Sequence, residues 1–263
     1  MLEVQSFPTV GEAAASMNEH SRFLGGGTLI MNRVNYGDQR FNRIVRTTDP
    51  AMSEIRVSGD HASIGAGVTM SAIIASTDLS FLSSAARAVG GPAIRNMASV
   101  GGNLMAPHPY GDLAVALLAL DGVVAMVDGT EMSLEDFLQR RSGVVQSVRV
   151  RRPQGDTFRF HKVTRVKPKG VSVMSMAAHL NRSAGRLTDV RIAYGAMGPT
   201  PLRVRAVEAA LENASLEPRG IAAALAAATD GLDPPDDPIA SGWYRREVAP
   251  VHLRRLLLGE NSL

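Results

Sequence analysis

ASVGGNLMAPHPYGD, residues 98–112, is the stretch of sequence that decides the fold. Gly101 and Gly102 can adopt positive φ and let another group approach the main chain closely. The N–H groups of consecutive glycines also form a concave site for an anion. Ser99 adds a hydroxyl and Asn103 a side-chain amide. The stretch fits a polar, phosphorylated ligand, although a tight Gly-Gly turn explains it better when it is taken alone.

An apolar helix is expected directly after this stretch. The run Leu113–Leu120 begins after Asp112 and ends before Asp121-Gly122. Aspartate is a preferred helix N-cap, and glycine is a common stop signal. We therefore expect Asp112 to cap a helix that starts beside the glycines.

A second glycine cluster, earlier in the chain, favours the ligand-binding interpretation. Gly25-Gly26-Gly27-Thr28 follows a short strand-like run at 21–24 and precedes the apolar residues 29–31. Glycines between a strand and a helix start hold anions on backbone N–H groups. The cluster has neither the Gly-x-Gly-x-x-Gly pattern of dinucleotide-binding folds nor the Gly-Lys-Ser/Thr of a phosphate-binding P-loop.

Composition limits the possible functions. The 263 residues are 45% hydrophobic and 20% charged, with a net charge of +3 and 5% aromatic residues. This length allows two compact domains. The small positive charge and few aromatic side chains argue against a nucleic-acid partner. Apolar runs are too short for a membrane span, and residues 1–5 lack signal-peptide character. We expect a cytoplasmic protein.

The chain contains no cysteine, and its six histidines never occur at metal-ligand spacing. Disulfides, a cysteine nucleophile and cysteine-ligated iron–sulfur clusters are thereby excluded within this chain. We expect no metal site and identify no catalytic acid or base. Redox chemistry here would require an organic cofactor.

The pattern of apolar residues predicts two domains, 1–155 and 156–263. The first divides into a small α/β unit at about 1–55, with a strand at 44–46 parallel to 21–24, and a second unit at 56–155 that opens with a hairpin at 55–68. Four strand-like runs at 144–150, 158–163, 171–180 and 187–194 have the spacing of an antiparallel meander. Helices are expected at 202–211, 219–229 and 247–258.

Four segments, in order along the chain, match one known family. They are LGGGTL at 24–29, ASVGGN at 98–103 with Asp112 nine residues later, GPTPLRVR at 198–205 with EAAL at 208–211, and YRR at 244–246 with LRRLL at 253–257. The chain resembles the FAD-binding (medium) subunit of molybdenum hydroxylases, the xanthine dehydrogenase and carbon monoxide dehydrogenase family. The resemblance covers nearly the whole chain.

This resemblance implies an α+β fold. A vanillyl-alcohol-oxidase (PCMH-type) FAD-binding domain of two α/β subdomains would precede a C-terminal domain with a three-stranded antiparallel sheet and helices. It also implies FAD contacts from two loops, with Asp112 binding a cofactor hydroxyl or stabilising its loop. The implied loop residues are Phe23, Leu24, Gly25, Gly26, Gly27, Thr28, Leu29 and Ile30 in the first loop and Ser99, Val100, Gly101, Gly102 and Asn103 in the second.

Four further positions carry expectations of their own. By the same resemblance, Val89 and Lys162 lie where the family touches FAD, but Lys162 fits a solvated strand residue equally well. Gly170 stands where the family commonly has an aspartate, and it marks either an altered flavin environment or a tolerated turn. His108, between two prolines, is expected to be a solvated loop residue.

The function implied by the resemblance is electron transfer. FAD on this chain would receive electrons from [2Fe-2S] clusters on a small partner subunit, after hydroxylation at molybdopterin on a large one, and would pass them to an external acceptor. The implied assembly is a dimer of heterotrimers. Two alternatives are a free-standing FAD oxidase or reductase of the same fold and a nucleotide-binding scaffold without redox turnover.

Overall fold

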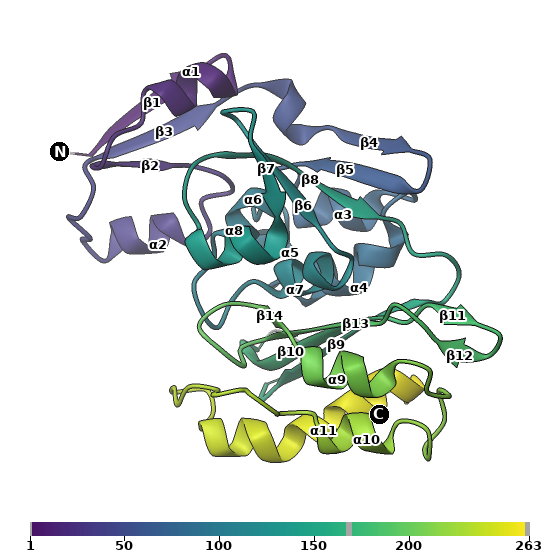
Figure 1. Cartoon of the computed structure of the whole chain (residues 1–263). Coiled ribbons are helices and arrows are strands. Elements are labelled where there is room, and N and C mark those ends of the chain that lie inside the picture. The colour runs from purple at the N-terminus through teal and green to yellow at the C-terminus, as the bar shows by residue number, and fades with distance from the viewer. Residues whose placement is uncertain (1, 167–169, 261–263) are drawn as a thin grey trace.

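The structure is a computed structural model that describes residues 2–166 and 170–260. Two sheet-and-helix units of the first 151 residues lie above a third unit formed by the rest of the chain (Figure 1). Mixed helices and strands, with antiparallel pairing in the C-terminal part, confirm the expected α+β fold class.

The N-terminal unit is a parallel three-stranded sheet in the order β1-β3-β2, from Glu3–Phe7, Arg43–Thr47 and Ser21–Phe23. The predicted parallel pairing of 44–46 with 21–24 is confirmed. Helices α1 (Val10–Ala15) and α2 (Ile30–Asn35) complete the unit. Thr9 caps α1 with the reciprocal Glu12 hydrogen bond of a capping box, so the local sequence fixes this helix start.

The second unit is an antiparallel five-stranded sheet in the order β4-β5-β8-β6-β7. Its strands are Ile55–Ser58, His61–Gly65, Val145–Arg151, Val123–Met126 and Glu131–Ser133. Its helical segments are η1 (Pro50–Ser53), α3 (Met70–Ala75), η2 (Ser80–Leu82), α4 (Ser83–Ala88), α5 (Pro92–Arg95), α6 (Val100–Leu104), α7 (Asp112–Ala119) and α8 (Leu134–Arg140).

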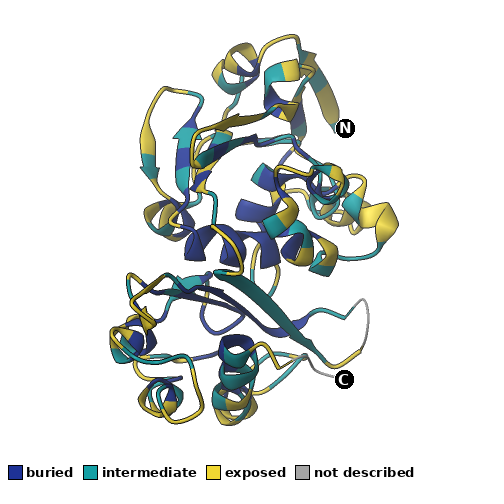
Figure 2. Ribbon diagram, turned by 90° about the vertical axis from the view of Figure 1, so that its right-hand side faces the viewer, coloured by how far each residue is buried: buried dark blue, intermediate teal, exposed yellow. Residues whose placement is uncertain are grey.

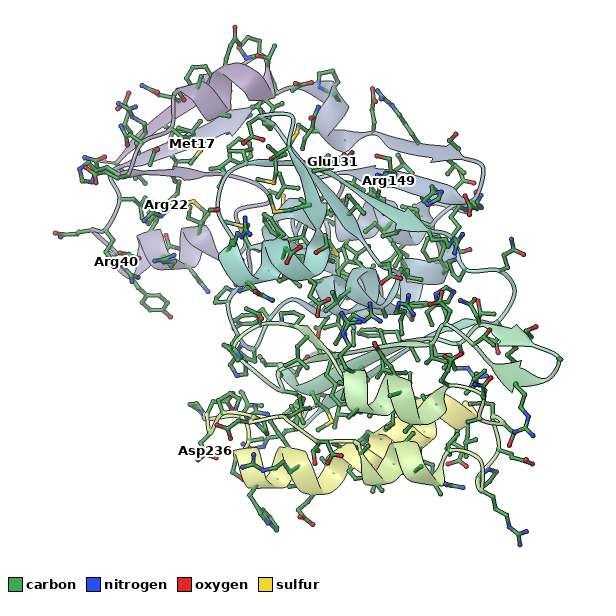
Figure 3. All side chains as sticks on the ribbon, viewed as in Figure 1. Met17, Arg22, Arg40, Glu131, Arg149 and Asp236 are labelled. Carbon is green, nitrogen blue, oxygen red and sulfur yellow. The ribbon has the colours of Figure 1, made fainter. Side chains whose placement is uncertain are left out.

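Strand β8 corrects the predicted four-strand meander. Its alternating pattern led us to place 144–150 with the later strands, but β8 lies between β5 and β6 of the earlier sheet. Arg149 on its solvent side donates to Glu131 of β7 at 3.1 Å (Figure 3). An alternating pattern shows that a strand has one buried face, and it does not show which sheet supplies the partner.

The third unit is an antiparallel sheet in the order β14-β13-β10-β9. The longer strands β9 (Phe158–Thr164), β10 (Ser172–His179) and β13 (Arg191–Gly195) form the expected three-stranded sheet, and β14 (Leu202–Arg203) extends it. Two-residue strands β11 (Arg182–Ser183) and β12 (Arg186–Leu187) form a small hairpin. The helices are α9 (Arg205–Leu211), α10 (Ala222–Ala226) and α11 (Gly242–Leu258).

Helix α7 joins the second and third units. It packs against β10 and β13 of the C-terminal sheet and against α4 and α6 of the earlier unit. All of its residues are buried, and Figure 2 shows buried helices stacked directly on the C-terminal sheet. The main apolar core therefore includes Ala177 and Ala193 of that sheet, while a second core lies between the sheet and α9, α10 and α11.

Candidate functional site

The two glycine loops lie against each other although they are 73 residues apart in the chain. The Ser99 hydroxyl oxygen accepts hydrogen bonds from the N–H of Gly26 at 3.2 Å and the N–H of Gly102 at 3.3 Å. Ser99 also caps α6. One serine thus fixes the first loop relative to the second. This contact agrees with the expectation that the two loops contribute to one ligand site.

The first loop is a cradle that only glycine can line. A Cβ at Gly26 would lie 1.7 Å from the Met97 carbonyl oxygen, and one at Gly25 would lie 2.7 Å from the Ser99 hydroxyl oxygen. Gly27 has a φ of +74°, which L side chains rarely adopt. Close approach and unusual backbone conformation together explain the run of three glycines.

Several backbone N–H donors of this cradle are unpaired in the part of the chain that the structure describes. Within the described residues, the N–H groups of Gly25, Gly27 and Thr28 have no hydrogen-bond partner. Adjacent free N–H groups favour an anion, because each carries a partial positive charge that must otherwise be met by water. The first loop therefore fits a phosphorylated group.

The second loop is built differently. The N–H of Val100 donates to Val68, that of Gly101 to Ala66 and that of Asn103 to Ser99, at 2.8–2.9 Å. A Cβ at Gly101 would lie 2.9 Å from the Ala66 Cβ. Gly101 therefore serves close packing, and the N–H groups of Val100, Gly101, Gly102 and Asn103 are already paired within the protein.

Asn103 and Asp112 connect this loop to α7. The buried Asn103 side-chain oxygen accepts from the N–H of Ala114 at 3.0 Å. Asp112 does not cap α7, so that prediction was wrong. The N-cap is Gly111, with a φ of 106°, and Asp112 is the first helical residue. Its carboxylate accepts from the Ser172 hydroxyl at 2.6 Å and from Lys162 Nζ at 2.8 Å.

Lys162 is largely shielded from solvent, with its side chain 14% exposed. Besides Asp112, its ammonium group donates to the Ala88 carbonyl at 2.8 Å, next to Val89 at the end of α4. The alternative of a solvated strand residue is therefore wrong. The structure brings together three predicted positions, Val89, Asp112 and Lys162. Ser172 joins them, and no local sequence signal marked it.

The hydrophobic residues of the first loop lie on either side of its glycines. Phe23 packs against the main core, and the N–H of Leu24 donates to Val45 at 2.7 Å. Leu29 occupies the N-cap position of α2 without a side-chain cap, and Ile30 is the first residue of that helix. These residues hold the ends of the cradle in place.

Gly170 lies close to the end of β9. Its N–H donates to the Val166 carbonyl at 2.8 Å, and a Cβ there would lie 2.4 Å from the same oxygen. A carboxylate side chain does not fit this backbone, which favours the interpretation of a tolerated turn. Lys167 and Lys169 lie outside the described residues.

His108 is not a solvated loop residue, contrary to expectation. Its side chain is 21% exposed, and its ring nitrogens lie 2.7 Å from Asp237 Oδ2 and 3.2 Å from the Gly198 carbonyl oxygen. Both partners belong to the C-terminal unit, so sequence proximity alone gave no sign of them.

Two features of the described part of the chain bear on other functions. No cluster of three or more His, Cys, Asp or Glu side chains there is arranged to hold a metal ion. None of its helices is long and apolar enough to cross a membrane.

Comparison with known proteins identifies the family. The family model for the FAD binding domain in molybdopterin dehydrogenase matches residues 2–150. The family model for the CO dehydrogenase flavoprotein C-terminal domain matches residues 159–259. The chain belongs to this flavoprotein family. FAD is its cofactor, and it is part of an oxidoreductase. The free N–H groups of the first loop suit the negatively charged pyrophosphate of FAD.

Individual flavoproteins of the family align along different lengths. The 6-hydroxypseudooxynicotine dehydrogenase complex subunit alpha of Paenarthrobacter nicotinovorans is 28% identical over 92% of this chain and 88% of its own. The glyceraldehyde dehydrogenase medium chain of Sulfolobus acidocaldarius is 25% identical over 64% of this chain and 63% of its own. A structure of carbon monoxide dehydrogenase from Hydrogenophaga pseudoflava shares the fold, with a TM-score of 0.87 at 23% identity and coverage of 97% and 96%.

Proposed function

We propose that this chain is the flavin subunit of a multi-subunit molybdenum hydroxylase. In this role FAD receives electrons from [2Fe-2S] clusters on a partner subunit and passes them to an external acceptor. The observation that carries the proposal is the cradle with free N–H groups on Gly25, Gly27 and Thr28. The chain's own task is to bind and orient the cofactor, which supplies the redox chemistry.

The residues of the site divide this task. The N–H groups of Gly25, Gly27 and Thr28 hold the pyrophosphate, while Ser99 and Gly102 form the facing wall. Asn103 keeps the start of α7 against this wall through Ala114. Lys162 and Asp112 fix the segment at Val89 as a further contact with the cofactor. In this proposal residues 1–155 form the FAD-binding domain and 156–263 the C-terminal domain of the subunit.

The proposed partners are a large molybdopterin subunit and a small [2Fe-2S] subunit, assembled as a dimer of heterotrimers. The absence of cysteine from the sequence supports this division, because cysteine-ligated clusters must then lie on another chain. The names of two relatives, a medium chain and a complex subunit, support it as well.

Gly102→Val tests the cradle. A Cβ at Gly102 would lie 3.1 Å from the Ser99 hydroxyl oxygen and 4.0 Å from the Gly26 nitrogen, so a branched side chain would fill the space in front of the first loop without a backbone clash. We expect the variant to fold and to lose FAD, measured by flavin absorbance per chain and by circular dichroism.

Gly11→Ala is the matched control, because a Cβ there meets nothing within 4 Å. It should retain FAD in full. A folded Gly102→Val protein with stoichiometric FAD would contradict the placement of the cofactor between the two loops. Purification with co-expressed subunits tests the assembly: iron–sulfur absorption in the complex supports electron transfer, and a colourless complex favours a scaffold.

A further inference from the structure

His108 occupies a bridging position at the edge of the proposed cofactor site. It lies in the segment 105–111, which runs from the end of α6 to the start of α7, so it is flanked by the second glycine loop and Asp112. Its ring reaches out of this segment to the C-terminal unit, where Asp237 Oδ2 is 2.7 Å from Nε2 and the Gly198 carbonyl oxygen is 3.2 Å from Nδ1.

Both partners of the His108 ring are acceptors. A carbonyl oxygen cannot donate, and a carboxylate accepts only. The neutral imidazole has a single N–H and can satisfy one of the two contacts, whereas the doubly protonated ring donates to both. The arrangement of partners thus selects the charged form of His108 and assigns its protons.

Asp237 is held as a carboxylate. Burial raises its pKa, but hydrogen bonds from His108, Ala240, Ile239 and Arg245 outweigh burial and keep the pKa well below the usual range. The N–H groups of Ile239 and Ala240 donate to Oδ1 at 2.8 and 3.0 Å, and Arg245 Nη2 donates to Oδ2 at 2.8 Å. The acceptor for His108 therefore keeps its charge at neutral pH.

Arg245 makes this acceptor rigid. Its side chain is fully buried, and it donates to the carbonyls of Val173 and Ala240 at 2.8 Å and to that of Pro235. It thereby ties the loop before α11, marked by Asp236 in Figure 3, to the region of β10. On the other side, a Cβ at Gly111 would lie 3.8 Å from Pro201, so the 105–111 segment rests against the turn before β14.

We infer that protonated His108 is a positioning residue that fastens the 105–111 segment, and with it the FAD site, to the C-terminal domain, and that its deprotonation loosens the cofactor. The inference rests on the proposed function, because it takes the glycine loops as the FAD site. It requires no contact between His108 and FAD.

The charged groups that face His108 come from the C-terminal unit. Asp237 and Arg245 face it from the loop before α11 and from α11, and Arg165, after β9, donates to the carbonyls of Pro238 and Ile239 at 3.4 Å. Tyr110 lies on its own segment, and the 196–201 turn carries no titratable side chain. Histidine is the side chain whose charge ordinarily changes between about pH 5 and 8.

The expected consequence is a pH-dependent release of FAD. With the ring protonated both ring nitrogens donate, and on deprotonation one of the two contacts is lost. Because a hydrogen bond to a charged group stabilises by an amount equivalent to about tenfold or more in an equilibrium, we expect FAD to leave about ten times faster at pH 8.5 than at pH 5.5.

The experiment measures FAD release from the purified holoprotein, with its co-purifying subunits, by the rise of flavin fluorescence after dilution between pH 5.5 and 8.5. His108→Gln retains a non-titrating donor for Asp237, so release should be slow and almost independent of pH. His108→Leu should release FAD rapidly at every pH. His61→Gln is the matched control, because His61 pairs with Asp60 at 2.7 Å on the exposed hairpin. It should keep the pH profile of the unmodified protein.

Two outcomes would overturn the inference: release that is independent of pH in the unmodified protein, or a pH profile that survives in His108→Leu. A lower melting temperature in His108→Leu with unchanged FAD release would also overturn it, since this is the result of a purely structural bond. These outcomes are distinguishable from failure of the proposed function, because that failure appears as full FAD retention in Gly102→Val.

Discussion

The two ends of α7 are both tied to the C-terminal domain by an aspartate, but in different surroundings. Asp112 at the first end is 8% exposed and meets Lys162 and Ser172 inside the protein. Asp121, just past the other end, is 51% exposed and meets Arg191 and Arg203, each at 2.9 Å. Equal charges and similar distances thus occur in a dry and in a wet environment.

The difference between the two ends shows that burial decides what an ion pair contributes. Water screens the pairs of Asp121, and the arginines have other partners, Asp189 for Arg191 and Glu208 for Arg203. At Asp112, loss of one partner leaves a charge in the interior, which is strongly unfavourable. The proposed cofactor site lies at the end where substitutions are costly.

Lys162→Met should have the largest effect. Removing the cation leaves the Asp112 carboxylate buried with Ser172, and breaking such a pair costs about 3–5 kcal/mol of unfolding free energy. Urea unfolding should be measured with excess FAD and without it. If the substitution only weakened FAD binding, it would lower the unfolding free energy in the presence of FAD and leave the value without FAD unchanged. Adding Asp112→Asn removes the uncompensated charge and should recover much of the loss. A decrease of less than about 1 kcal/mol in the unfolding free energy would show that this pair contributes no more than an exposed ion pair.

Ser172→Ala should have an intermediate effect. It removes the 2.6 Å hydrogen bond to Asp112 while Lys162 remains, and an unsatisfied buried acceptor costs about 1–3 kcal/mol. The control is Ser183→Ala on the exposed strand β11, which should change the unfolding free energy little. If both serine substitutions changed the unfolding free energy equally, the claim that burial makes the Asp112 end of α7 more sensitive to substitution would be wrong.

Asp121→Asn should cost less than about 1 kcal/mol. Asp121 has a φ of 49°, which asparagine tolerates, so the change removes charge without backbone strain. We also expect the small effect to shrink further in 0.5 M NaCl, because salt screens exposed pairs. A large loss that does not respond to salt would show that this end is as dry as the first.

His179→Gln should have the smallest effect, visible in the pH dependence of stability. Burial lowers the pKa of His179, which lies near Asp121, and the carboxylates of Asp121 and Asp189 offset this only in part. Below about pH 6.5 the unfolded chain then binds a proton that the folded chain does not, so stability falls as pH falls. The variant should flatten this slope in urea unfolding between pH 7 and 5.

The contribution of His252 to the pH dependence of stability must be removed from this measurement. Burial lowers its pKa to about 4, so it adds a slope of the same sign between about pH 6.5 and 4. The comparison is therefore made in a His252→Gln background. An unchanged slope in the double variant would contradict the role assigned to His179.

Features fixed by neighbouring residues were predictable from the sequence. The capping box at Thr9, the parallel strand at 44–46 and the two glycine loops each carry their cause within a few residues. The resemblance to a family supplied the fold class and the cofactor, which the family comparison confirmed. The contacts of individual site residues with FAD stay predictions.

Features that depend on distant partners were not predictable. Val145–Arg151 has the pattern of any half-buried strand, and only the assembled sheet places it between β5 and β6. Lys162 and His108 look like surface residues in their local sequence, because Asp112 and Asp237 lie 50 and 129 residues away. The two glycine loops also look alike in sequence, yet among the described residues both glycines of the second loop donate within the protein, whereas the N–H groups of Gly25 and Gly27 in the first loop stay free.

The placement of α7 has a consequence for the folding unit of the protein. Val115 of this helix lies so close to β13 that a Cβ at Gly195 would come within 2.6 Å of it. A fragment ending at Arg151 would expose this apolar side of α7 to water, and the complementary fragment would lose the cover of its sheet. The main apolar core therefore spans the boundary between the two domains, and we expect either fragment expressed alone to be less stable than the intact chain.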